Sequence, residues 1–295
     1  MTEAVKPQPT HRREGSDALV DPAWLEAHKN DPDVCLIEIA GFGQDDLQAY
    51  GMGHLPNAYA WKWREMLWDD HVRDFPSPQE FARRLGAAGI GNDTTVVFYG
   101  EGEQFGFYAW WAFRYCGHRN VRVLDGARYR WVEEGRPLVT DLPAPRRQVE
   151  YTPVSRVEHM RIHRDEVLKA LSEPGGLILD ARSVEEYNGQ RVGVPGFPDV
   201  GAERYGRIPD AKHLLYSDLL SANKSFKPLD ELRTLVLERG ARQNPDQEII
   251  AYCRLSHRAT VVYFALTELL GFENVRLYDG SWTEWGSLVG VPVER

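Results

Sequence analysis

The sequence is poor in cysteine and has no long apolar run. Its three cysteines, Cys35, Cys116 and Cys253, are an odd and low number, which argues against a disulfide framework. No uncharged apolar segment approaches the ~18 residues that a membrane-spanning helix requires. Residues 1–20 contain no apolar core of a secretory signal. From these absences we expect a cytoplasmic protein in a reducing compartment, with no membrane partner.

The chain also lacks an excess of positive charge. It contains 35 Lys and Arg residues against 44 Asp and Glu residues, a formal net charge of −9. Nucleic-acid-binding proteins attract phosphates with a basic surface, so we expect no nucleic-acid partner. Hydrophobic residues make up 42% and charged residues 27%, which is typical of globular proteins and excludes disorder throughout. The length of 295 residues favours two domains of ~100–200 residues each.

Three segments recur in the same order in the two halves of the chain. The matching pairs are Asn120–Trp131 with Asn274–Trp285, Gly53–Pro56 with Gly206–Pro209, and Thr95–Tyr99 with Glu248–Tyr252. We interpret this repetition as a duplicated domain. A stretch rich in proline and charge between the halves favours an extended connector. The expected organisation is a flexible tail at 1–17, an N-terminal domain at 18–140, a linker at 141–158 and a C-terminal domain at 159–295.

Short apolar runs alternate with amphipathic stretches in each half. The runs predict strands at 34–39, 95–99, 121–124, 177–180, 249–252 and 275–278. The amphipathic stretches predict helices at 77–88, 105–115, 165–171, 229–239 and 257–270. This alternation predicts an α/β fold in which each domain is a parallel sheet flanked by helices. Ligands of such sheets bind at the carboxyl ends of strands, which directs attention to the loops after Tyr99 and Tyr252.

The second of these loops carries a cysteine. Cys253 lies between a predicted strand and a predicted helix, where unpaired backbone N–H groups and the helix dipole favour a thiolate and bind anions. Arg254 and Arg258 are expected to add two fixed positive charges. We therefore interpret Cys253 as a nucleophile. Cys35 lies in an apolar strand and Cys116 at a helix end, which is typical of core residues.

Other functions are weaker interpretations of cysteine, histidine and glycine residues in this sequence. Cys116 and His118 are two metal-ligand types without a partner pair, so we expect no metal. The glycines after residue 99 do not have the G-x-G-x-x-G spacing of a dinucleotide loop, so no nucleotide cofactor is expected. Cysteine phosphatases use a C-x5-R loop, whereas Cys253 to Arg258 is C-x4-R. The shorter loop favours a single sulfur atom on the cysteine over a phosphate ester.

These residues resemble the rhodanese superfamily, specifically the tandem-domain thiosulfate sulfurtransferases. The resemblance covers nearly the whole chain after the tail, and further motifs support it: Gly53–Pro56, Trp131–Pro137, Asp180-Ala-Arg182 followed by Glu186-Tyr187, and Tyr278–Gly286. It implies two rhodanese-like domains, of which only the C-terminal one carries the catalytic cysteine. Gly100 aligns with Cys253, and Glu101 and Glu103 beside it would repel an anion, as expected of a degenerate copy.

The resemblance implies a sulfurtransferase without a cofactor. Cys253 would take the outer sulfur of thiosulfate as a persulfide and pass it to a small acceptor, cyanide or a thiol, or to a thiol protein. Arg254 and Arg258 would hold the sulfonate. Asp180 and Arg182 are expected to brace these arginines, with a surface ion pair as the alternative.

The other loop residues, Leu255, Ser256 and His257, are also expected to line the substrate site. Ser256 would either donate a hydrogen bond to the sulfur or cap the following helix. His257 would either add positive charge below neutral pH or be solvated.

Three alternatives stay open. Two loop arginines favour a doubly charged donor, yet Leu255 replaces the lysine of thiosulfate-specific animal enzymes, so 3-mercaptopyruvate is a second donor to consider. A cysteine phosphatase is disfavoured by the loop length. A sulfur-relay module fed by a partner protein would also use Cys253. One site in two domains suggests that a monomer is sufficient for catalysis.

Overall fold

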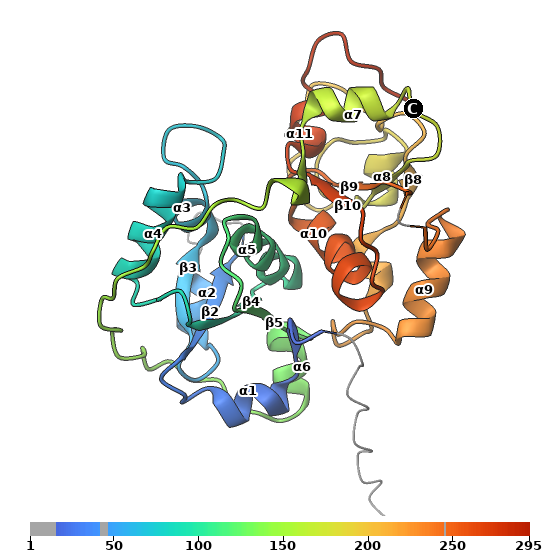
Figure 1. Ribbon diagram of the computed structural model, residues 1–295. Coiled ribbons are helices and arrows are strands. Elements are labelled where there is room, and N and C mark those ends of the chain that lie inside the picture. The colour runs from blue at the N-terminus through green and yellow to red at the C-terminus, as the bar shows by residue number, and fades with distance from the viewer. Residues whose placement is uncertain (1–15, 42–46, 245) are drawn as a thin grey trace, which may run out of the picture.

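The protein contains two five-stranded sheets, one in each half of the chain (Figure 1). The structure is a computed structural model that describes residues 16–41, 47–244 and 246–295. The expected flexible tail therefore lies almost entirely outside the described residues. The strand orders are β1-β5-β4-β2-β3 and β6-β10-β9-β7-β8, and every pairing is parallel. The predicted α/β fold is confirmed, and the two sheets repeat one topology.

The first sheet and its helices use residues 19–133. In chain order the elements are β1 (Leu19–Val20), α1 (Pro22–His28), β2 (Val34–Ala40), α2 (Gln48–Met52), β3 (Tyr59–Lys62), α3 (Trp63–Leu67), α4 (Pro78–Ala87), β4 (Thr95–Gly100), α5 (Glu103–Tyr115), β5 (Val121–Leu124) and α6 (Ala127–Glu133). Pro78 occupies the first turn of α4, and Ser77 caps it by accepting from the Glu80 N–H at 3.2 Å.

The second sheet repeats this plan. Its elements are β6 (Arg161–Ile162), α7 (Arg164–Ala170), β7 (Leu177–Asp180), α8 (Val184–Tyr187), β8 (Lys212–His213), α9 (Leu229–Glu238), β9 (Ile249–Tyr252), α10 (His257–Phe264), β10 (Val275–Tyr278) and α11 (Ser281–Trp285). Two 3₁₀ turns, η1 (Glu158–Met160) and η2 (Tyr216–Leu219), precede β6 and follow β8.

All six predicted strands are present, and their bounds agree to within one residue. The helix predicted at 257–270 is α-helical only to Phe264 and continues as a π-helix, η3 (Ala265–Leu269). The helix predicted from Phe105 starts two residues earlier, at Glu103. The four edge strands β1, β3, β6 and β8 were not predicted. Two residues are too few to show a periodic pattern in β1, β6 and β8, and all four residues of β3 are half-buried, so β3 has no alternation of buried and exposed side chains.

A buried hydrogen-bond pattern also occurs once in each half. Tyr99, on β4, donates its hydroxyl to Glu38 at 2.5 Å, and Tyr252, on β9, donates to Asp180 at 2.6 Å. Each tyrosine oxygen in turn accepts a backbone N–H, that of Leu55 in the first half and that of Ile208 in the second. The repetition extends from the sheets to individual polar side chains, as a duplication requires.

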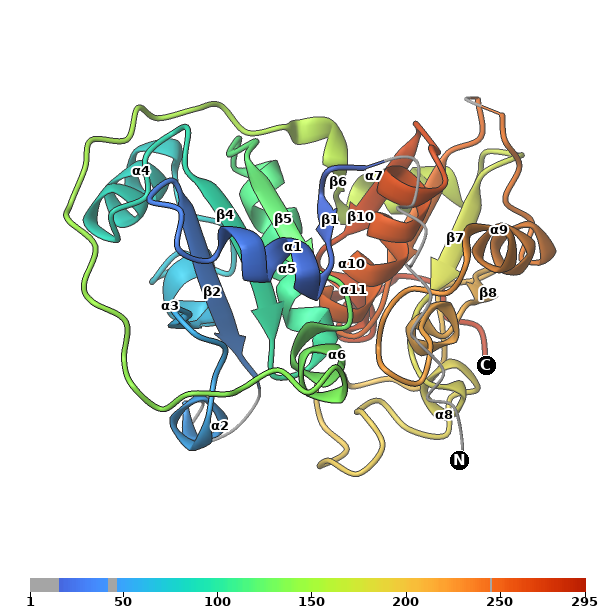
Figure 2. The same cartoon turned by 90° about the horizontal axis from the view of Figure 1, so that it is seen from below.

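The two halves pack through α5 and α10, which lie side by side between the sheets (Figures 1 and 2). Aromatic rings fill the contact: Phe264 lies 5.1 Å from Phe107 and 4.7 Å from Trp110, measured between ring centroids. One apolar cluster therefore continues through both halves. Because the cysteine loop begins α10, this packing brings it to the junction. In the described part of the chain, no helix is long and apolar enough to cross a membrane.

Candidate active site

Cys253 follows β9 and is almost fully buried, with 1% of its surface exposed. The segment from β10 to α11 holds the backbone around it. The Cys253 N–H donates to the Ser281 hydroxyl oxygen at 3.2 Å, and the Cys253 carbonyl accepts the Trp282 N–H at 2.9 Å. The Arg254 carbonyl accepts both the N–H and the hydroxyl of Thr283, at 3.0 and 2.8 Å. Four hydrogen bonds therefore fix the start of the loop.

The rest of the loop leaves backbone donors unfilled. The N–H groups of Leu255, Ser256, Arg258 and Ala259 make no hydrogen bond within the part of the chain that the structure describes. N–H groups at the start of a helix form a ready site for an anion. The loop can thus stabilise negative charge that develops on or beside the Cys253 sulfur.

Arg258 carries a fixed positive charge, as expected, but the carboxylate of Glu186 opposes it. Its guanidinium forms a bidentate pair with Glu186, at 2.6 and 2.8 Å, and both side chains are buried. Burial by itself opposes both charges, but the pairing outweighs it, so the pKa of Arg258 is raised and the pKa of Glu186 is lowered. The pair is therefore ionised with no net charge.

Arg254 forms no ion pair with any carboxylate of the described residues. It is half-buried, and its Nε makes no hydrogen bond to the described residues. Burial, followed by repulsion from Arg258, lowers its pKa below the ordinary value. The guanidinium lies against Gly201, where an added Cβ would come within 2.6 Å of Nε. The positive charge of the loop thus rests on Arg254, beside a glycine that leaves it room.

Ser256 plays neither of its expected roles. Its hydroxyl donates to Asp279, with 2.6 Å to the carbonyl oxygen and 2.7 Å to Oδ1. The hydroxyl hydrogen is therefore unavailable to a sulfur atom. The residue occupies the N-cap position of α10 without a capping hydrogen bond, because its φ of 69° is left-handed.

His257 is neither solvated nor cationic, contrary to both expectations. Its side chain points into the junction of the two halves, with 3% of the residue exposed. The ring lies 4.2 Å from Tyr108, 4.5 Å from Trp63 and 5.1 Å from Phe105. Burial lowers its pKa to about 3, so the imidazole is neutral at pH 7. His257 is therefore a packing residue among the aromatic rings between the two halves.

Acidification should therefore destabilise the protein through His257. The unfolded chain binds a proton on this residue below about pH 6.5, whereas the folded protein does not until about pH 3. Stability from this group is complete above pH 6.5 and is lost as the pH falls. Between pH 7 and 4.5 we expect a loss of about 2–3 kcal/mol that His257→Gln abolishes, measured by urea unfolding at both pH values. An unchanged pH dependence in the variant would contradict this result.

Asp180 and Arg182 do not touch the loop arginines. Arg182 Nη2 binds Asp180 Oδ2 at 2.6 Å, and both side chains are completely buried, so the surface-pair alternative is also wrong. Arg182 stacks on Trp282 at 4.5 Å and donates to the Gly206 carbonyl at 2.8 Å. The pair joins β7 to the segment behind the loop.

Leu255 is half-buried and packs against the apolar cluster. Glu186, Asp279 and Ser281 also contact the loop, and they were not among the residues predicted for the site. All three lie in motifs that support the resemblance, so these motifs were the available signal. The motifs do not show, however, which side chains pair across the fold.

The loop after β4 occupies the matching place in the first half. At Gly100 an added Cβ would come within 2.5 Å of the Gly102 carbonyl oxygen, so a cysteine does not fit there. Glu103 is buried at the start of α5. This copy cannot supply a second nucleophile.

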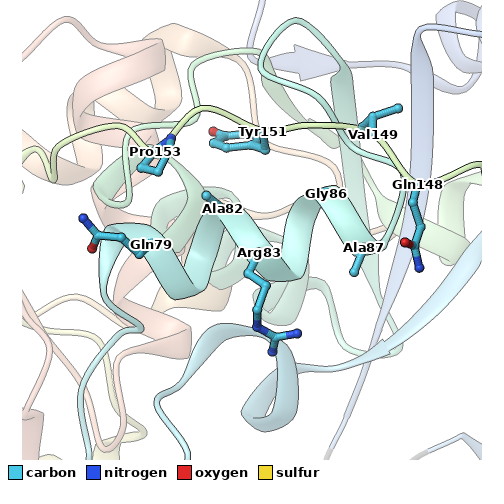
Figure 3. A pocket seen from close by; sticks show the side chains of 9 residues that line it. All are labelled: Gln79, Ala82, Arg83, Gly86, Ala87, Gln148, Val149, Tyr151 and Pro153. Carbon is cyan, nitrogen blue, oxygen red and sulfur yellow. The ribbon is translucent and has the colours of Figure 1, made fainter.

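A separate groove lies between α4 and the linker (Figure 3). The linker runs from α6 past α4 to β6 (Figure 2), and the Val149 N–H donates to the Gly86 carbonyl at 3.0 Å. The groove is lined by Gln79, Ala82, Arg83, Gly86, Ala87, Gln148, Val149, Tyr151 and Pro153. None of these residues belongs to the cysteine loop, so the groove is not part of the candidate site.

Known proteins share this architecture and sequence. Residues 21–134 and 163–288 each match the family model of the rhodanese-like domain. The chain is 41% identical over 286 residues to the sulfur carrier protein TtuD of Thermus thermophilus, covering 95% of this chain and 97% of that protein. It is 39% identical over 285 residues to a "Putative thiosulfate sulfurtransferase" of Haloferax volcanii, with 95% and 96% covered. The crystal structure of SseA from Escherichia coli, described among 3-mercaptopyruvate sulfotransferases, matches with a TM-score of 0.73 at 28% identity, covering 90% of this chain and 98% of that one.

Proposed function

Because this chain belongs to the rhodanese family, we propose that it is a thiosulfate sulfurtransferase that works through a persulfide on Cys253. The observation that carries the proposal is the loop itself. Cys253 is buried in the loop between β9 and α10, among backbone N–H groups that make no hydrogen bond to the described residues. The relatives named as sulfurtransferases support the class of reaction.

The first half-reaction forms the persulfide. The Cys253 thiolate attacks the outer sulfur of thiosulfate, a new S–S bond forms, and sulfite leaves with the electron pair of the old one. Arg254 holds the sulfonate and stabilises the charge on the departing sulfite. The free N–H groups of the loop stabilise the negative persulfide.

The second half-reaction regenerates the free Cys253 thiolate. Cyanide or a thiolate attacks the outer sulfur of the persulfide, and the Cys253 thiolate leaves. Sulfur passes from donor to acceptor without an external oxidant or reductant. The order is ping-pong, since sulfite departs before the acceptor reacts.

A second candidate is a sulfur relay that exchanges sulfur with a partner protein. The 41% identical relative named as a sulfur carrier favours it. The loop chemistry is the same in both cases, and only the source or acceptor of the sulfur differs.

The test is the intact mass of the reduced protein after incubation with thiosulfate. We expect a gain of one sulfur atom, which cyanide removes as thiocyanate. The sulfur is assignable because burial raises the pKa of Cys35 to about 11 and that of Cys116 to about 12, which keeps both as unreactive thiols.

Cys253→Ser is the control and should gain no sulfur. Repeating the incubation with 3-mercaptopyruvate ranks the two donors. If neither donor adds mass but a persulfidated protein transfers sulfur to Cys253, the relay would be the better account and the proposed enzyme activity would be rejected. Sulfur on the Cys253→Ser variant would overturn the assignment of the nucleophile.

A further inference from the structure

The cysteine loop contains a residue in a conformation that its side chain disfavours. Ser256 has a φ of 69°, in the left-handed region that glycine adopts without strain. Its backbone N–H is one of the unfilled donors of the loop. A non-glycine residue keeps such a conformation only when its surroundings hold it there.

Two contacts constrain Ser256: the His257 N–H donates to the Leu255 carbonyl across it at 2.9 Å, and Asp279 binds its side chain. The Ser256 hydroxyl donates to the Asp279 carbonyl oxygen at 2.6 Å and to Oδ1 at 2.7 Å. The Asp279 carboxylate is 1% exposed, so it requires positive partners to remain ionised. Arg161 is one of them, at 3.2 Å from Oδ2.

The other partner comes from the opposite half of the molecule. Arg73 follows α3 and binds the Asp279 carboxylate with both terminal nitrogens, Nη1 at 2.8 Å from Oδ2 and Nη2 at 3.2 Å from Oδ1. Its guanidinium lies 3.9 Å from the Trp68 ring centroid. Trp68 in turn donates its indole N–H to the Tyr108 hydroxyl at 2.6 Å. Contacts within the first half therefore orient the Arg73 guanidinium toward Asp279.

We propose that Arg73 is a positioning residue for the reaction of Cys253: through Asp279 it holds Ser256 left-handed and so shapes the sulfur-binding loop. The inference rests on the proposed function for its substrate. It gives the half without a nucleophile an effect on the loop that Asp279 transmits. Arg73 forms a bidentate ion pair with the buried Asp279 carboxylate. That carboxylate accepts the hydroxyl of Ser256, whose backbone is part of the loop.

The conformation of Ser256 makes the proposal testable. Glycine adopts φ near 69° without help, so Ser256→Gly should keep the loop in shape without Asp279. Ser256→Ala keeps the strain and loses the hydrogen bond. We expect Ser256→Ala to slow the reaction of Cys253 about tenfold and Ser256→Gly to slow it less than about threefold.

The decisive experiment is a double-mutant cycle of Arg73→Met and Ser256→Gly. The readouts are the rate of persulfide formation from thiosulfate and the rate of Cys253 alkylation by iodoacetamide. Arg73→Met alone should slow both about tenfold, but by less than about twofold in the Ser256→Gly background. The same slowing in both backgrounds would show that Arg73 only joins the two halves, and would overturn the proposal.

Three controls separate the possible failures. Alkylation needs no sulfur donor, so it reports on the loop even if thiosulfate is not the substrate. Arg156→Met removes a nearby arginine that donates to the Phe75 and Pro76 carbonyls and should leave both rates unchanged. If Arg73→Met does not fold, Arg73→Lys replaces it in the cycle, and the alanine and glycine variants of Ser256 still decide. Equal rates in those two variants would contradict the role of the left-handed residue.

Discussion

Replacing Arg258 by methionine is expected to lower the free energy of unfolding by about 3–5 kcal/mol, because the Glu186 carboxylate would remain buried without its partner. The two side chains now share two hydrogen bonds of 2.6 and 2.8 Å, and Glu186 is 0% exposed. Urea unfolding at pH 7 measures the loss. Lowering the pH into the range where carboxylates titrate should reduce it, since the isolated Glu186 can then be protonated.

Two variants check the cause of that loss. Arg258→Met combined with Glu186→Gln removes both charges and should recover most of the stability. Arg276→Met breaks pairs with Glu166 and Glu248, which are partly exposed, and should cost less than about 1 kcal/mol. Equal losses for the Arg258 and Arg276 variants would show that burial of the Glu186 pair has no special effect.

Replacing Arg254 by glutamine should lower kcat/KM for thiosulfate by about 10- to 150-fold. This range corresponds to the ~1.5–3 kcal/mol that a hydrogen bond to a charged group contributes. The expected loss is large because Arg258 is already neutralised by Glu186, so no second loop charge replaces Arg254. Steady-state kinetics with thiosulfate and cyanide measure it.

The dependence on salt provides an independent check of the Arg254 prediction. Removing a charge that attracts the dianion should weaken the fall of kcat/KM with ionic strength. Lys212→Gln, which removes an exposed cation on β8, is the matched control and should leave both quantities unchanged. A loss in Lys212→Gln equal to that in Arg254→Gln would assign the effect to net charge alone.

Much of the fold could be read from local pattern. The runs around Cys35, Val97 and Ile250 are continuous and apolar, as strands buried on both faces are, and all became central strands. The position of Cys253 followed from the same pattern, since a loop between a strand and a helix has a fixed place at the edge of a parallel sheet. The two-residue edge strands had no pattern to read.

The sequence by itself determined the duplication, the parallel sheets and the single cysteine at the start of a helix, because each depends on residues close together in the chain. Only the tertiary structure decided which charged groups of the loop are paired and which are unpaired. Glu186 cancels Arg258 across 72 residues, and Asp279 takes the Ser256 hydroxyl across 23. The aromatic rings of the first half keep His257 neutral. Ionisation and hydrogen-bond direction depend on what surrounds a group in space, and the order of residues along the chain does not contain that information.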